Sequence, residues 1–168
     1  VFGTPSEFDF YRYNVCKKFG EKPIALCADH SGYNAKELAK VTLDTLNIPY
    51  IDYGCFVEQD CDYKDYVQEA VKAISDRTCD FGMSFCRTGQ GVNMCANKYD
   101  GIRSALIYDD FSAEMAVRHN CANMFSIPAL LVEKNKSFPS FLQTTIAKLS
   151  ENTFDGGRFQ ARVMELEK

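Results

Sequence analysis

Short apolar runs alternate with amphipathic segments along most of the chain. A run of about four to eight apolar residues between turn residues indicates a buried strand, and apolar residues spaced three and four apart indicate one face of a helix. The first pattern predicts strands over residues 23–28, 50–53, 81–85, 102–108 and 123–127. The second predicts helices over residues 33–46, 92–98 and 112–118, a helix around Val67, Ala70, Val71 and Ile74, and another around Leu142, Thr145, Ile146 and Leu149.

The last of these helices carries start signals ahead of its apolar stripe. Ser137 is placed to cap the helix, because its side-chain oxygen can accept a hydrogen bond from a backbone N–H of the first turn. Pro139 fits that first turn, where its missing N–H would have no partner within the helix.

The order of the elements indicates the fold class. Repeated alternation of strand and helix predicts an α/β protein with a parallel sheet and helices on both faces. A length of 168 residues favours one domain, and no internal repeat or linker divides the chain. We therefore expect an N-terminal extension over residues 1–21, packed on a single domain over residues 22–168.

Charge and hydropathy narrow the function classes. A net charge of −4 disfavours a general nucleic-acid binder, which is usually basic, although local arginines can still bind a small anion. No apolar run approaches the ~20 residues that span a membrane, and the aromatic start of the chain does not look like a signal peptide. We expect a cytoplasmic protein that binds neither nucleic acid nor a membrane.

The eight cysteines include no C-x-x-C pair. An even number permits disulfides, but the fold class is not that of a small disulfide-stapled protein. We therefore expect free thiols in a reducing compartment. With two histidines and no zinc-ligand spacing, a structural metal site is not expected.

One cysteine stands out by its place in the predicted fold. Cys86 ends the apolar run 81–85 and is followed by Thr88, Gly89 and Gly91, after which a helix begins. Ligands of open α/β sheets bind outside the carboxyl ends of the strands. Cys86 is therefore a candidate nucleophile or base, the alternative being a buried structural cysteine that acts as a small hydrophobe.

The tail over residues 152–168 carries a candidate anion site. Arg158 and Arg162 are four residues apart, so on a helix they share a face. Two guanidinium groups on one face can bind a phosphate through paired N–H donors. The alternative is a solvated tail with surface ion pairs.

Six motifs occur along the chain in an order that resembles a known family. They are Asp29-His30-Ser31-Gly32, Asp62-Tyr63-x-Asp65-Tyr66, Cys86-x-Thr88-Gly89-x-Gly91, Asn97-Lys98-x-x-Gly101-Ile102-Arg103, His119-Asn120-x-x-Asn123 and Gly156-Gly157-Arg158-x-x-x-Arg162. Together they resemble the type B ribose 5-phosphate isomerase family, which also contains the galactose 6-phosphate isomerase subunits. The resemblance covers about residues 22–165.

The resemblance implies a Rossmann-like, doubly wound, five-stranded parallel sheet. It also implies a homodimer or a dimer of dimers, with the active site between two subunits and the C-terminal tail docking on a partner subunit. The reaction would interconvert an aldose phosphate and its 2-ketose through a cis-enediolate, without a metal or an organic cofactor.

On this resemblance, Cys86 would be the base that moves a proton between C1 and C2. A helix N-terminus and a neighbouring cation, here Arg87, favour the thiolate. Backbone N–H groups at Gly89 and Gly91 would face the enediolate oxygens, although two glycines also suit a plain tight turn. Thr88 would steady a proton near the substrate or cap the following helix.

His119 would open the furanose ring by moving a proton onto the ring oxygen, because imidazole titrates near neutral pH. Asp29 would assist through a hydrogen bond to a sugar hydroxyl. Asn120 would hold the sugar or the enediolate oxygen.

The phosphate would be bound by His30 together with Arg158 and Arg162. Tyr63 would pack along the sugar, with ordinary core packing as the alternative.

The chain departs from the family pattern at three places. Arg87 stands where the family usually has glycine, Lys64 stands where it usually has proline, and residues 126–130 lack the family's phosphate-binding arginine. These changes suggest a site reshaped for a different sugar phosphate or an acidic sugar. Two other interpretations stay open: a subunit that is silent without a partner, and a thiol redox protein, which the absence of C-x-x-C disfavours.

Overall fold

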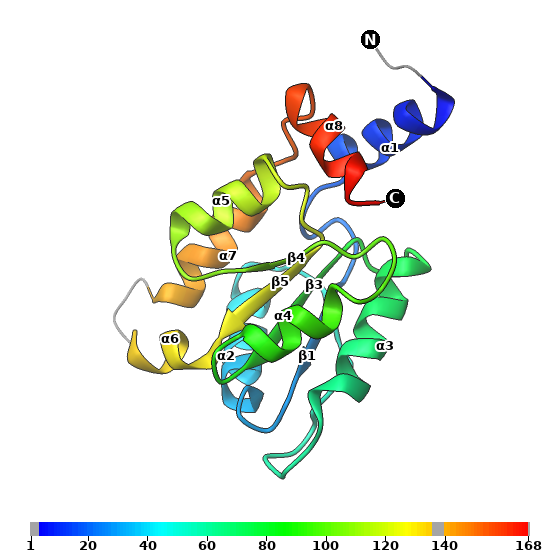
Figure 1. The fold of residues 1–168 in the computed structure, drawn as a ribbon. Coiled ribbons are helices and arrows are strands. Elements are labelled where there is room, and N and C mark those ends of the chain that lie inside the picture. Colours follow the sequence, from blue (N-terminus) through cyan, green and yellow to red (C-terminus); the bar gives the residue numbers. More distant parts are fainter. Residues whose placement is uncertain (1–3, 136–139, 168) are drawn as a thin grey trace.

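A single parallel sheet forms the centre of the computed structural model, which describes residues 4–135 and 140–167 (Figure 1). Its five strands lie in the order β2-β1-β3-β5-β4, and the neighbouring strands pair in parallel. The strands are β1 (Ile24–Ala28), β2 (Tyr50–Asp52), β3 (Phe81–Cys86), β4 (Ser104–Leu106) and β5 (Met124–Pro128). The predicted five-stranded, Rossmann-like sheet is thereby confirmed.

Helices cover both faces of this sheet, as predicted. Helices α3 and α4 bury apolar side chains on the face of β1 that carries Ala25 and Cys27, whereas α2, α5, α6 and α7 pack on the face that carries Leu26 and Ala28. Alternate residues of a strand point to opposite faces, so β1 contributes to two cores. The helices are α1 (Pro5–Cys16), α2 (Tyr33–Thr45), α3 (Tyr63–Ser75), α4 (Gln90–Ala96), α5 (Asp110–Arg118), α6 (Ala129–Lys134), α7 (Phe141–Glu151) and α8 (Arg158–Glu165).

Two boundaries differ from the sequence prediction for a common reason. β4 is shorter than the predicted run 102–108, and α5 begins before Ser112. The Ser112 hydroxyl accepts the N–H groups of Tyr108 and Asp109, while the Asp109 carboxylate accepts the N–H of Ser112. This reciprocal cap diverts the backbone from the sheet and starts the helix early.

The start of α7 is capped in the same way. Ser140 accepts the N–H of Gln143, and the Gln143 side chain accepts the N–H of Ser140. The four predicted core positions of this helix are buried. Ser137 and Pro139, the predicted start signals, lie outside the described residues.

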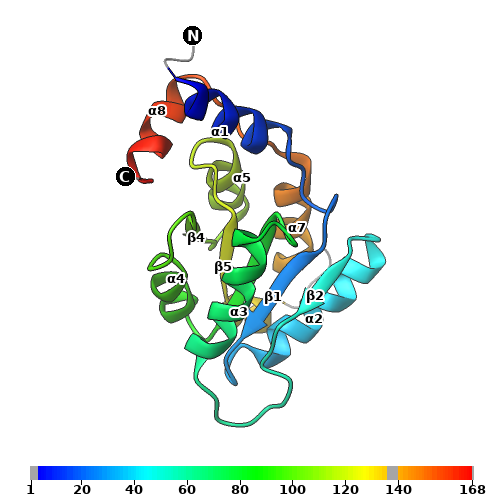
Figure 2. The same cartoon turned by 90° about the vertical axis from the view of Figure 1, so that its right-hand side faces the viewer.

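The N-terminal extension contains a helix, α1, for which the apolar pattern gave no prediction. It lies beside α8 at one end of the molecule (Figures 1 and 2). Gln160 donates a hydrogen bond to the carbonyl of Glu7 at 3.0 Å, and the Tyr11 ring packs on Gly156. The C-terminal tail therefore packs on the extension of its own chain. No helix in the described ranges has the length and apolar character to cross a membrane.

Candidate active site

The ends of β1 and β3 bring Asp29 and Cys86 to the carboxyl edge of the sheet. The two strands are neighbours, with Ala28 paired to Phe85, and the N–H of Asp29 donates to the carbonyl of Phe85 at 3.2 Å. Cys86 is 5% exposed and Asp29 is 8% exposed. This edge therefore presents a thiol and a carboxylate, both largely shielded from water.

Ser31 joins the loops that follow these two strands. Its hydroxyl donates to Asp29 Oδ1 at 2.7 Å and accepts the N–H of Arg87 at 2.9 Å. The N–H of Gly32 donates to the same carboxylate oxygen at 2.8 Å. Sequence reasoning did not assign Ser31 a role, although its place in the Asp29–Gly32 motif was the available signal.

Gly32 permits the close approach of the two loops. A Cβ at this position would lie 2.2 Å from the carbonyl oxygen of Phe85, so any larger residue would force the loops apart. The contact fixes the distance between the Asp29 loop and the Cys86 loop.

The glycines after Cys86 both have a packing role. Gly89 adopts φ +73°, and a Cβ there would lie 2.6 Å from Leu106. At Gly91 the added Cβ would lie 3.0 Å from the ring of Tyr63, so Tyr63 packs over the first turn of α4. The Thr88 hydroxyl accepts the N–H of Gln90 at 3.4 Å. These contacts agree with the structural alternatives, a tight turn at the two glycines and a helix cap at Thr88. They are also compatible with contacts between these residues and a substrate.

His30 lies beside the connection between β2 and α3. Its Nδ1 is 3.3 Å from Asp60 Oδ1 and 3.5 Å from the carbonyl oxygen of Cys61. The side chain is 46% exposed, so it can also reach a ligand at the carboxyl edge.

Arg87 turns toward α6. Its Nη1 lies 3.3 Å from Glu133 Oε2, and its carbonyl accepts the N–H of Leu130 at 3.2 Å. Helix α6 begins within residues 126–130, the segment without the expected arginine, and it brings the Glu133 carboxylate to Arg87.

The remaining predicted residues lie at the opposite edge, where His119 and Arg158 both contact Phe159. The His119 ring stacks on Phe159 with ring centroids 3.9 Å apart, and its Nε2 lies 3.7 Å from Asp155 Oδ2. The Arg158 guanidinium lies 4.9 Å from the centroid of the same ring. Asn120 follows His119, and Arg162 lies one turn beyond Arg158 on α8. The two arginines and Asn120 are exposed.

One chain does not bring these two groups together. Cys86 pairs with Pro128 at the carboxyl end of β5, whereas His119 precedes the amino end of that strand. A strand of five residues spans roughly 16 Å. Cys86 and His119 of one chain are therefore too far apart to form one compact active site together.

Several acidic, thiol and imidazole side chains lie near the carboxyl edge. No group of three or more His, Cys, Asp or Glu side chains within residues 4–135 and 140–167 is arranged to hold a metal ion.

Residues 24–166 match the family model described as Ribose/Galactose Isomerase. A Ribose-5-P isomerase B of Listeria innocua is 32% identical over 145 residues, which cover 86% of this chain and 95% of the relative. A crystal structure of a ribose 5-phosphate isomerase of Thermotoga maritima, 32% identical, superposes with a TM-score of 0.81 over 88% of this chain and 98% of that one. A Bacillus subtilis relative, 35% identical over 146 residues (83% of this chain and 91% of the relative), carries the broader, provisional name of sugar phosphate isomerase. The chain therefore belongs to the ribose/galactose isomerase family, and the expectation of an aldose–ketose isomerase is confirmed.

Proposed function

We propose that the chain interconverts ribose 5-phosphate and ribulose 5-phosphate through a cis-enediolate, with Cys86 as the base. The observation that carries this proposal is the position of Cys86, buried at the end of β3 and held beside Asp29 by the Ser31 bridge. The names of the Listeria and Thermotoga relatives support the choice of substrate.

In the proposed reaction, the Cys86 thiolate removes the proton from C2 of the open-chain aldose. The resulting enediolate accepts that proton from the thiol at C1, while the hydroxyl proton moves from O2 to O1. Backbone N–H groups near Gly89 and Gly91 would face the developing negative charge, and Thr88 would donate to one of the oxygens. Tyr63, which lies over Gly91, would pack along the sugar.

A second copy of the chain would complete the site, in a homodimer or a dimer of dimers. His119 of that copy would transfer the proton that opens the furanose ring. Asp155, whose Oδ2 lies 3.7 Å from His119 Nε2, would help to orient the imidazole for this transfer. Asn120 would hold the sugar, and Arg158 and Arg162 would bind the phosphate. This proposal rests on the separation of the two groups within one chain and on the exposure of both arginines.

A second candidate substrate is a hexose phosphate or an acidic sugar. The observation that favours this candidate is the Arg87–Glu133 ion pair, which places two charged side chains beside the proposed base Cys86. Asp29 would then contact a hydroxyl of this sugar, and His30 would bind its phosphate.

The direct test is turnover of ribose 5-phosphate by the purified chain and by two cysteine variants. Cys86→Ala should lower kcat by at least ~10³-fold, since it removes the group that moves the proton. Cys95→Ala, a partly buried thiol on neighbouring α4, is the matched control and should stay within about twofold of the parent. Equal activity of both variants would exclude Cys86 as the base, and activity that appears only with another subunit would favour a silent subunit.

A further inference from the structure

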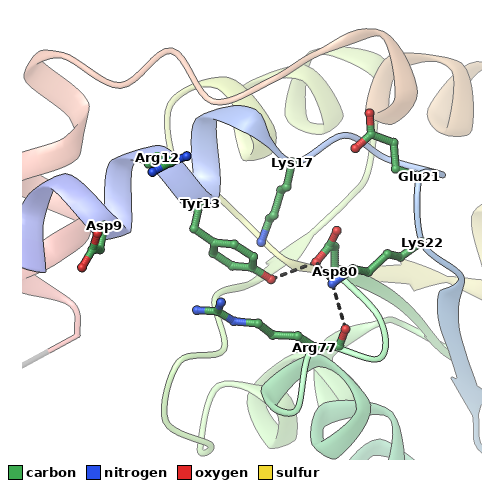
Figure 3. Close-up of a pocket in the computed structure, with 8 residues that line it drawn as sticks. All are labelled: Asp9, Arg12, Tyr13, Lys17, Glu21, Lys22, Arg77 and Asp80. Atoms are coloured by element: carbon green, nitrogen blue, oxygen red, sulfur yellow. Dashed lines mark hydrogen bonds and ion pairs between the residues drawn. The ribbon is translucent and has the colours of Figure 1, made fainter.

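We propose that a pocket beneath α1, at the amino edge of the sheet, binds a small anion that carries a phosphate group. The pocket lies between α1, the segment that joins α1 to β1, and the segment that joins α3 to β3 (Figure 3). Its volume is about 700 Å³, within the range of about 300–1,000 Å³ that is usual for metabolite sites. The proposed isomerase residues do not line it.

The principal observation is the side chain of Lys17. It is 7% exposed, and its ammonium lies 4.9 Å from the ring centroid of Tyr13 and 4.7 Å from that of Phe81. Within the described part of the chain this ammonium makes no hydrogen bond and no ion pair. A buried charge is unfavourable unless it is paired, so an anion bound beside Lys17 would stabilise this ammonium.

The buried acid of the pocket already has its partners. Asp80 Oδ1 accepts a hydrogen bond from the Tyr13 hydroxyl at 2.9 Å and lies 3.4 Å from the Lys22 ammonium. Figure 3 shows the Tyr13–Asp80 contact beside the inward-pointing Lys17. Because Asp80 also pairs with Lys22, it offsets the charge of Lys17 only in part, and Asp80 and Lys17 form no ion pair within the described residues.

Arg77 adds a second cation whose charge is available to a ligand. Its guanidinium stacks on the Tyr13 ring, 4.2 Å from the centroid, and forms no ion pair in the described residues. The stacking orients its planar set of N–H donors, a geometry suited to phosphate oxygens. Lys17 and Arg77 face the same Tyr13 ring from different segments.

The rim charges limit the kind of anion. Arg12 lines the pocket as a third cation, while Asp9 and Glu21 line it as exposed acids. These acids lie away from Lys17 in Figure 3 and would repel a highly charged polyanion. A ligand with one phosphate and an uncharged remainder fits this arrangement best.

The site is built partly from residues that precede the family match and partly from Arg77 and Asp80, which lie inside it. Helix α1, Lys17 and Lys22 come before residue 24, where the match begins. The same helix packs on α8, which carries Arg158 and Arg162. A ligand that holds α1 in place would therefore also steady α8.

Inorganic phosphate is the probe for this proposal. Its binding is measured by calorimetry at constant ionic strength, in a His30→Ala, Arg158→Ala, Arg162→Ala background so that phosphate bound by the proposed substrate site does not contribute. In that background, Lys17→Met should weaken phosphate binding by at least tenfold. Lys18→Met is the matched control, because this exposed neighbour lies outside the pocket and loses the same charge.

Equal phosphate affinity of the Lys17→Met and Lys18→Met proteins would overturn the proposal, and so would failure of the background protein to bind millimolar phosphate. Arg77→Gln gives an independent test if Lys17→Met does not fold, since Arg77 is exposed and its loss leaves the core unchanged. It should weaken phosphate binding at least threefold, and unchanged affinity would count against the site.

Discussion

The Arg87 guanidinium pairs with the Glu133 carboxylate across the carboxyl edge of the sheet, with Nη1 and Oε2 3.3 Å apart. Arg87 directly follows Cys86, and Glu133 lies on the helix that follows β5. The side chains are 58% and 43% exposed. An exposed pair of this kind contributes no more than about 1 kcal/mol to stability, so its consequences should appear in substrate choice.

Arg87→Gly should change the ratio of kcat/KM between pentose and hexose phosphates by at least about tenfold, equivalent to ~1.4 kcal/mol of differential transition-state binding. The melting temperature should fall by no more than ~4 °C. Glu133→Gln removes the partner and retains Arg87, so its ratio should stay within about twofold. An unchanged ratio in Arg87→Gly would show that Arg87 does not select the substrate.

Ser31→Ala should lower kcat about tenfold with little change in KM, because Ser31 holds both Asp29 and the backbone of the Cys86 loop. The lost hydrogen bonds should also reduce stability by about 1–2 kcal/mol. Ser31→Thr retains the hydroxyl and should restore most of the rate. If Ser31→Thr were as slow as Ser31→Ala, the hydroxyl would not be the positioning group.

Mixing two inactive variants tests whether the site is shared. Co-expressed Cys86→Ala and His119→Asn chains should regain about a quarter of the parental activity, because random pairing gives one intact site in half of the dimers. Each variant alone should stay inactive. A site built within one chain would show no such recovery.

The carboxyl-edge half of the site could be predicted from the sequence because its signals are local. Asp29 and Cys86 each end a short apolar run, and parallel strands bring such ends to one edge. The place of His119 at the opposite edge follows from the same predicted order, because a residue just before a parallel strand lies at that strand's amino end. Its contacts with Phe159 and Asp155 could not be predicted from local signals, because they depend on how the C-terminal tail packs on α5.

Helix α1 was missed for a related physical reason. Its apolar residues form no clear stripe, and Phe10 is half-buried against distant parts of the chain, which include Val163 of α8 and Cys121 before β5. Long-range packing of this kind leaves little trace in a local pattern.

Lys36 is another case that local pattern could not show. The residue looks like a surface lysine of a helix, yet it is fully buried, paired with Asp52 of β2 and 3.0 Å from Glu37 Oε1. Asp52→Ala should destabilise the protein by about 3 kcal/mol, since it leaves this buried ammonium short of a partner. Asp44→Ala, an exposed acid of the same helix, is the control and should change the free energy of unfolding by less than about 1 kcal/mol. Similar losses in denaturant unfolding of both variants would contradict the assignment.

The buried ammonium of Lys17 should make stability depend on pH. Desolvation by burial is the main reason why the pKa of Lys17 falls to about 8. Cys121 and Asp80 act to raise this pKa, and Arg103 and Arg77 act to lower it. In the unfolded chain the lysine keeps its proton to about pH 10.4. Between these values the unfolded state binds more protons, so the Lys17 contribution to stability rises as the pH rises from about 8 to 10.

Lys17→Met should therefore stabilise the phosphate-free protein at pH 7 by up to about 3 kcal/mol, and this gain should shrink toward zero by about pH 10. Denaturant unfolding of the parent and the variant at both pH values gives the difference, in which the titration of other groups cancels. Lys18→Met should show little change at either pH, because Lys18 is exposed. A gain that is the same at pH 7 and pH 10 would mean that methionine stabilises by packing alone. A gain that disappears at high pH would identify the unpaired charge as the destabilising feature, the charge that a bound phosphate would neutralise.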